Sequence, residues 1–160
     1  MSDEIDGSGV PIQDHPHYIA NLKGNYGFFA DMQDDEIYQF LRLCHRQEFD
    51  EGATIFNEGD DAEDFFLILS GEIVITAGGQ EFSRLRTGQI FGEMGILEHE
   101  GRNASASVSE KAEVFSVSRE ILETKVPALG FKIACNIALQ LSSKLRQADE
   151  QLKNPPAAGG

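Results

Sequence analysis

A glutamate and an arginine in one glycine-rich stretch are the residues of this sequence best suited to bind a small molecule. Glu93 lies next to Gly92 and close to Gly95, and Arg102 follows Gly101. The guanidinium of an arginine offers a planar set of donors that fits phosphate oxygens, and a carboxylate accepts hydrogen bonds from sugar hydroxyls. Glycines let a ligand approach the backbone closely. The pair therefore indicates a site for a ribose phosphate, that is, a small anionic nucleotide.

The segment 93–97, which begins at Glu93, carries helix-compatible side chains. It predicts one short helical turn. The unbonded amide hydrogens and the positive end of such a turn would face the same phosphate.

The stretch 91–108, FGEMGILEHEGRNASASV, resembles the phosphate-binding cassette of cyclic nucleotide-binding domains, the family of bacterial catabolite activator proteins and kinase regulatory subunits. The glutamate, the arginine and the alanine at Ala104 fall in the family's places. Two positions depart from the pattern. Gly101 stands where the family usually has proline, which loosens the turn, and Asn103 stands where it has alanine, serine or threonine, which weakens the basis for a base preference.

The resemblance implies a role for each of these residues. Arg102 would pair with the cyclic phosphate, Glu93 would bind the ribose 2′-hydroxyl, and backbone amides would complete the cradle. The ligand-binding residues that it implies are Phe91, Gly92, Glu93, Met94, Gly95, Arg102, Asn103 and Ala104.

After His45 the sequence pattern changes from helical to strand-like, with short apolar runs interrupted by turn residues. Over residues 47–118 this rhythm predicts a double-stranded antiparallel β-roll, or jelly roll, in a mainly β protein with flanking helices. The resemblance to the family covers about residues 20–152. The strands and turns expected are Phe49 before a turn at Gly52, Thr54–Phe56 before Gly59, Phe65–Leu69 before a hairpin at Ser70-Gly71, Ile73–Thr76 before Gly78-Gly79, Glu81–Leu85 before Gly88, Ala104–Val108 and Val114–Val117.

The N-terminal part of the chain predicts helices, and both ends predict polar extensions. Residues 1–16 have the composition of a flexible arm, and residues 154–160 that of a tail. Residues 17–30 predict short helical turns. A helix over residues 34–46, capped by Asp34, should pack its apolar face on the core. In the family such a segment moves against the roll; plain packing is the alternative.

Residues 119–153 predict C-terminal helices, the longer of which starts at Pro127. Its apolar residues recur at threes and fours over more turns than a roll of this size needs to cover its side. The resemblance implies a lid over the base, with Arg146, Ala148 and Asp149 as candidate contacts. In dimeric members of the family this helix pairs with its twin, which makes a homodimer an expectation; simple docking on the roll is the alternative.

The base preference follows from one of these lid residues. Asp149 would accept a hydrogen bond from the 6-amino group of adenine, but it would face an acceptor oxygen on guanine. This hypothesis favours cyclic AMP over cyclic GMP.

Composition excludes several other functions. The formal net charge of −14 in 160 residues argues against a nucleic-acid-binding surface, which needs clustered lysine and arginine. No apolar run approaches the roughly 20 residues that span a bilayer, so no membrane insertion is expected. With 41% hydrophobic residues, the chain predicts one domain over residues 17–153.

Cysteine and histidine usage predicts neither a disulfide nor a metal. Cys44 and Cys135 both fall in helical apolar patterns, so we expect core residues in a reducing, cytoplasmic compartment. His15 and His17 form a pair without further ligands nearby, so no metal and no cofactor is expected. The chain also lacks a nucleophile elbow, a P-loop lysine or a suitable carboxylate pair, which argues against an enzyme.

The sequence thus leads to one function hypothesis and two alternatives. The hypothesis is a stand-alone cyclic AMP sensor in which binding rearranges the terminal helices and signals to a separate, unidentified effector protein. The alternatives are a cyclic GMP sensor and a ligand-free interaction module with the same fold. Retention of both Glu93 and Arg102 argues against the interaction module.

Overall fold

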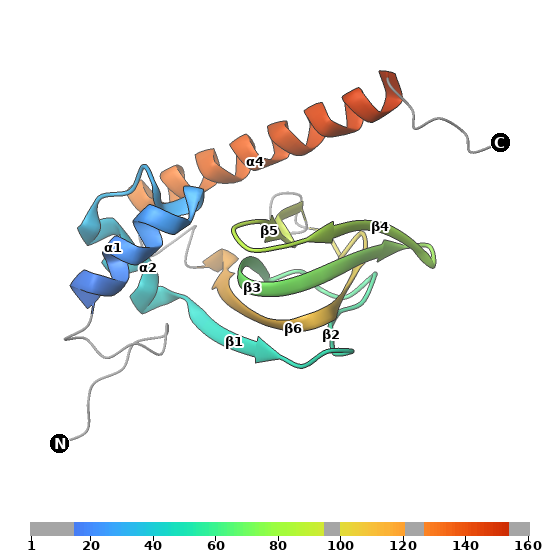
Figure 1. Ribbon diagram of the computed structural model, residues 1–160, viewed down its shortest axis with the longest axis horizontal. Helices are drawn as coiled ribbons and strands as arrows, with labels where there is room; N and C mark the ends of the chain where they lie inside the picture. Colours follow the sequence, from blue (N-terminus) through green and yellow to red (C-terminus); the bar gives the residue numbers. More distant parts are fainter. Residues whose placement is uncertain (1–14, 95–99, 121–126, 154–160) are drawn as a thin grey trace.

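The computed structural model describes residues 15–94, 100–120 and 127–153. Figure 1 shows an antiparallel β-roll, a group of short helices at one end of it, and one long helix that runs across its side. The mainly β roll with flanking helices is the fold class that the sequence predicts. The tail and nearly all of the arm expected from the sequence lie outside the described residues.

In the sequence, helical elements precede and follow the strands of the sheet. The helical elements are α1 (His15–Asn25), the 3₁₀ helix η2 (Gly27–Phe29), α2 (Asp34–Leu43) and α4 (Pro127–Lys153). The strands are β1 (His45–Phe49), β2 (Thr54–Phe56), β3 (Asp64–Ala77), β4 (Gln80–Leu85), β5 (Ile90–Phe91) and β6 (Ser105–Ser118). The strand order is β1-β6-β3-β4, with β2 also paired to β6 and β5 also paired to β3. The hairpin expected at Gly78-Gly79 is confirmed between β3 and β4.

The long strands β3 and β6 form the spine of the sheet, and here two expectations are wrong. The sequence predicted a hairpin at Ser70-Gly71 and two separate strands, 104–108 and 114–117, but β3 and β6 each continue for 14 residues. The apparent turn is a bulge, since Gly71 has a φ of +90° and the β3–β6 register shifts on both sides of it. A Cβ at this position would lie 2.3 Å from the carbonyl oxygen of Lys111, so only glycine fits.

Both faces of β3 are buried, and its side chains alternate between two apolar clusters. Phe65, Leu67 and Leu69 belong to a cluster that includes residues of α1, α2 and α4. Phe66 and Ile68 belong to a second cluster formed by the strands of the roll. Because successive side chains of a strand point to opposite faces, one strand holds the helices on one side and closes the roll on the other.

The N-terminal helices differ from the expectation at their ends. Helix α1 begins at His15, so its first two residues are helical rather than part of the arm. Helix α2 ends at Leu43, not at residue 46 as expected, and β1 begins at His45. Its N-cap is Gln33, which forms a capping box with Glu36, so the cap expected at Asp34 is wrong by one residue.

Helix α4 spans residues 127–153, which confirms the helix expected from Pro127. Its apolar residues do not share one environment. Ile133 and Ile137 are buried in the core, whereas the side chains of Leu145 and Leu152 are mostly exposed. The helix therefore packs on the core through Ile133, Ile137 and the partly buried Leu141, and its last turns extend beyond the core.

The two cysteines lie in different environments. Cys44 is buried, as expected, but Cys135 is exposed on α4, so its expected place in the core is wrong. The short helix expected before α4 is described only at residues 119–120. Within the described ranges, no helix is both long and apolar enough to cross a membrane.

Candidate functional site

A pocket of about 640 Å³ lies between the roll and the second half of α4. Its walls come from strands β2 to β5, from the segments that follow β5 and precede β6, and from α4. In Figure 1 α4 runs past β5 and β4, and side chains of this helix and of the sheet line the pocket together. Of the pocket's lining side chains, Glu93 and Arg102 are both buried.

Gly92, directly after β5, allows the arginine to approach the backbone. It has a φ of +79°, and its carbonyl oxygen accepts a hydrogen bond from Nη1 of Arg102 at 2.7 Å. A Cβ at this position would lie 2.7 Å from the same nitrogen. A side chain here would therefore displace the guanidinium.

The guanidinium of Arg102 is anchored but not saturated. Its Nη2 donates to the carbonyl oxygen of Asp64 at 2.7 Å, and its central carbon lies 4.1 Å from the ring centroid of Phe56 and 5.8 Å from that of Phe66. Its Nε is buried and has no hydrogen-bond partner among the described residues. The site thus holds a cation beside two aromatic rings, with the buried Nε–H donor unused.

Burial shifts the pKa values of two groups at this position. Desolvation lowers the pKa of Arg102, because the charged form loses its hydration, and the carboxylates of Asp64 and Asp60 oppose this shift. Desolvation also raises the pKa of Asp64, which the charge of Arg102 opposes. A buried guanidinium bonded mainly to neutral carbonyls favours an added anion nearby.

Glu93 is the other buried charge of the pocket, and helix α4 supplies its partner. Only 4% of its side chain is exposed, and Oε1 accepts a hydrogen bond from Nζ of Lys144 at 2.9 Å. The same ammonium donates to the carbonyl oxygen of Ile90 in β5 at 3.1 Å. One lysine therefore joins α4 to both the last sheet strand before the site and the acidic residue of the site.

The pocket brings together most of the site residues expected from the sequence. The expected residues among its walls are Phe91, Gly92, Glu93, Met94, Arg102, Asn103, Ala104 and Ala148. Gly95, with most of the helical turn expected over 93–97, lies outside the described residues.

Arg146 and Asp149 do not line the pocket, and both are exposed. The residues of α4 that do so include Lys144, Gln147 and Gln151. Positions three and four apart share a helix face, so a helix that presents 144, 147, 148 and 151 turns 146 and 149 away. In this structure Asp149 therefore faces away from the pocket, and its contact with adenine stays a prediction.

Several wall residues were missed by the sequence reasoning. Phe56, Ile75 and Phe82 come from strands far from the cassette in sequence. Phe82 is 80% exposed, and its place on a short, otherwise polar strand is the one signal that could have singled it out. Lys144 carried no comparable signal, because a lysine on an amphipathic helix ordinarily faces solvent.

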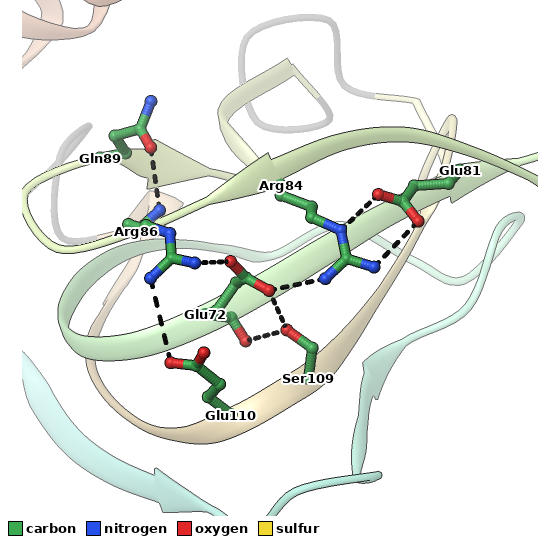
Figure 2. Close-up of polar contacts among 7 residues, drawn as sticks. All are labelled: Glu72, Glu81, Arg84, Arg86, Gln89, Ser109 and Glu110. Atoms are coloured by element: carbon green, nitrogen blue, oxygen red, sulfur yellow. Dashed lines mark hydrogen bonds and ion pairs between the residues drawn. The ribbon is translucent and has the colours of Figure 1, made fainter.

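A second cluster of charged side chains lies on the same sheet, around the buried Glu72 of β3 (Figure 2). Its Oε1 accepts hydrogen bonds from Arg84 at 2.7 Å and from Ser109 at 2.7 Å, and its Oε2 pairs with Arg86 at 2.5 Å. The hydrogen bond from Ser109, followed by the one from Arg84, lowers the pKa of Glu72. Both oxygens of this carboxylate have hydrogen-bond or ion-pair partners. The cluster therefore links β3, β4 and β6 and stabilises the sheet.

No group of three or more histidine, cysteine, aspartate or glutamate side chains is placed to hold a metal ion in the parts of the chain that the structure describes. The pocket offers instead the buried guanidinium of Arg102, the carboxylate of Glu93 with its lysine partner, and a wall with many apolar side chains. This combination suits an organic ligand that carries an anionic group and hydroxyls.

A β-roll whose pocket combines a buried arginine and a buried glutamate under a long helix defines a class of small-molecule binding domain. The sequence model of the cyclic nucleotide-binding domain matches residues 46–126. The chain belongs to this family. The family is one of ligand-binding rather than catalytic domains.

Three similar proteins illustrate the range of the family. The cyclic AMP receptor protein of Thermus thermophilus is 32% identical over 136 residues, which are 82% of this chain and 62% of that protein. A cGMP-dependent protein kinase of Toxoplasma gondii is 33% identical over 146 residues, 88% of this chain and 14% of the kinase. The crystal structure of a cyclic nucleotide-binding domain from Methylobacillus flagellatus has a TM-score of 0.75 at 21% identity, covers 92% of this chain and 88% of that one, and supports the fold.

The chain spans less than two thirds of the length of either sequence relative. The activities of those whole proteins therefore do not carry over to this chain. The similarity covers the binding domain that they contain.

Proposed function

We propose that this chain is a regulatory protein that binds cyclic AMP in the pocket between the roll and α4. The observation that carries the proposal is the pairing, in one pocket, of a buried arginine with an unused donor and a buried carboxylate. The pocket volume of about 640 Å³ falls within the range of about 300 to 1,000 Å³ that small-molecule sites occupy. The protein acts by binding, without catalysis.

Each part of the nucleotide has a matching group. Arg102 would bind the cyclic phosphate through Nε and its neighbouring nitrogens, since an anion compensates a desolvated guanidinium. Glu93 would accept a hydrogen bond from the ribose 2′-hydroxyl, and backbone amides at Gly92, Gly95 and Asn103 would complete the phosphate cradle. The apolar walls, including Phe82, suit a purine ring.

Signal output would pass through α4, because this helix contributes to the pocket and also packs on the N-terminal helices. A ligand that contacts both the roll and α4 stabilises the arrangement in which they are close. The side chains of Leu139 and Leu145, which are exposed outside the pocket, offer apolar contacts to an effector protein or to a second copy of the chain. A cytoplasmic location agrees with cysteines that form no disulfide in the described residues.

Isothermal titration calorimetry of the full chain with cyclic AMP, cyclic GMP and 5′-AMP tests the proposal. We expect saturable binding of cyclic AMP, weaker binding of cyclic GMP and none of the open-chain 5′-AMP at the same concentrations. Stronger binding of cyclic GMP would support the second candidate, which the cGMP-dependent kinase among the relatives favours. Absence of binding for both cyclic nucleotides would contradict the proposal and leave an interaction module.

A further inference from the structure

Every fourth residue along one face of α4 carries a polar side chain whose partner lies in another element. Residues four apart lie above one another on a helix, so these side chains form one row along α4. The four residues are Lys132, Asn136, Gln140 and Lys144.

The first half of this row holds the N-terminal helices. Nζ of Lys132 lies 2.6 Å from Oε1 of Glu36 in α2, and Nδ2 of Asn136 donates to the carbonyl oxygen of Phe28 in η2 at 3.0 Å. The hydrogen bond from Lys132 lowers the pKa of Glu36.

The second half of the row covers the outer edge of β5. Gln140 accepts a hydrogen bond from the backbone N–H of Ile90 at 3.0 Å and donates to the carbonyl oxygen of Gly88 at 3.3 Å. Lys144 donates to the carbonyl oxygen of Ile90. These side chains satisfy backbone groups that a further strand would otherwise pair, and so they fix the position of α4 along the sheet.

That position brings Lys144 to Glu93. The hydrogen bond of 2.9 Å uses Oε1 of the carboxylate, and no described residue donates to Oε2. A carboxylate has acceptor capacity on both oxygens, so one can bind the lysine while the other accepts a hydroxyl. Removal of the lysine would leave a buried carboxylate without a countercharge and without a fixed orientation.

We propose that Lys144 is a positioning residue for Glu93: it orients the carboxylate so that Oε2 receives the 2′-hydroxyl of a bound ribose, and Gln140 holds α4 in the register that this requires. The inference rests on the proposed function and extends it to a residue of the lid helix. It predicts that Lys144 matters only for ligands that carry the 2′-hydroxyl.

The experiment compares cyclic AMP with 2′-deoxy-cyclic AMP as ligands of the full chain. The variants are Lys144→Met, Lys144→Arg and Glu93→Gln, with Lys153→Met as the control that removes the same charge from α4 outside the pocket. Thermal unfolding of each variant reports whether it is folded.

We expect the parent to bind cyclic AMP about tenfold more tightly than the deoxy ligand, the scale of one hydrogen bond to a charged group. Lys144→Met should weaken cyclic AMP about tenfold and leave the deoxy ligand unchanged, as should Glu93→Gln. Lys144→Arg should restore much of the ratio, because it keeps a donor and a charge. Lys153→Met should behave as the parent does.

Two results would overturn the inference while leaving the proposed function intact. If Lys144→Met weakened the binding of both ligands equally, the lysine would only hold α4 against the sheet and would not orient Glu93. Tighter binding of cyclic AMP by Lys144→Met would make it a competitor of the ligand for Glu93. If the methionine variant does not fold, the same comparison is made with Lys144→Gln, and a parent that binds neither cyclic nucleotide overturns both proposals.

Discussion

Glu72 in β3 and Glu93 just after β5 are both buried glutamates, each with 4% of its side chain exposed, yet their surroundings differ in kind. Glu72 is saturated by two arginines and a serine, which lie in β4, directly after β4 and in β6. Glu93 has one partner among the described residues, Lys144, and lines a pocket. Burial of a charged side chain therefore does not by itself identify a binding site. A buried carboxylate that lines a pocket and still has an oxygen free to accept a hydrogen bond does.

The arginines show the same contrast. Arg84 forms hydrogen bonds with two carboxylates, those of Glu72 and Glu81, and these bonds raise its pKa further above its ordinary value (Figure 2). Arg102 bonds to backbone carbonyls only, and burial lowers its pKa. The first arginine has its countercharges within the sheet, whereas the second can gain one from a ligand.

The largest expected effect tests the unsaturated arginine. Arg102→Ala should weaken cyclic AMP by about 3 to 4 kcal/mol, because the phosphate loses a charge-assisted contact and remains partly desolvated. Calorimetric titration measures the loss. Arg86→Ala, which removes an arginine of the saturated cluster outside the pocket, should leave the affinity unchanged.

Arg102 also joins two backbone segments, so the variant needs a stability measurement beside it. Arg102→Lys keeps the charge but not the fork of donors and should retain part of the affinity. A folded Arg102→Ala variant that binds like the parent would refute the role of this residue in the site.

A somewhat smaller effect is expected at the bulge in β3, whose backbone positions Glu72 and its cluster. Gly71→Ala, directly before Glu72, should cost about 3 kcal/mol of unfolding free energy, since it combines strain at positive φ with a clash against the Lys111 carbonyl. Gly78→Ala has positive φ but open space around it and should cost about 1 kcal/mol. Urea denaturation measures both; equal costs would mean that β3 does not depend on the bulge.

The site was predictable from the sequence where its residues lie close together in the chain. The glycine, glutamate and arginine of segment 91–104 form one local motif, and the structure places them in one pocket. The turn glycines other than Gly71 and the extent of α4 were predictable for the same reason, because turn chemistry and helical periodicity are local properties.

The remainder depends on contacts between distant segments. Gly71 carries the signal of a turn, yet pairing with β6 decides that the chain continues as a bulged strand. The choice of Lys144 rather than Asp149 as a pocket residue depends on the rotation of α4, which Gln140 fixes against β5. Periodicity defines the apolar face of a helix but not the neighbour that each polar residue meets.

A pH dependence of stability should distinguish the saturated glutamate from an exposed one. The folded-state pKa of Glu72 lies below its ordinary value of 4.5, so its stabilising contribution is fully present above that pH and is lost as the pH falls through the folded-state pKa. Glu72→Gln should therefore destabilise the protein at pH 7 and progressively less below about pH 4.5. Thermal unfolding across this range measures the difference, with the exposed Glu51→Gln, outside this cluster, as control; a difference that does not change with pH would contradict the assignment.

Hydrogen exchange tests the ligand-dependent side of the comparison. Saturation with cyclic AMP should slow exchange in residues 140–152 of α4, because a ligand held by both the roll and the helix stabilises their contact. Exchange in β3 around Glu72 should change less, since that region is already saturated. Mass spectrometry with and without ligand measures both, and unchanged protection over 140–152 would make α4 a static support.

The smallest expected effect concerns the choice between adenine and guanine. Gln147 and Gln151 line the pocket where Asp149 was expected, and a carboxamide both donates and accepts hydrogen bonds. It can therefore meet the 6-amino group of adenine or the 6-oxygen of guanine, and the repulsion that a carboxylate would impose on guanine is absent. We expect cyclic AMP to be preferred over cyclic GMP by about 1 kcal/mol or less, that is, within about tenfold.

Competition binding of the two nucleotides to the parent and to Gln147→Ala, Gln151→Ala and Asp149→Ala measures the ratio. Asp149→Ala should leave it unchanged, because that side chain faces away from the pocket. A preference above about a hundredfold in the parent would show that a group with a single hydrogen-bonding character faces the base, and a ratio altered by Asp149→Ala would show that α4 turns when the ligand binds.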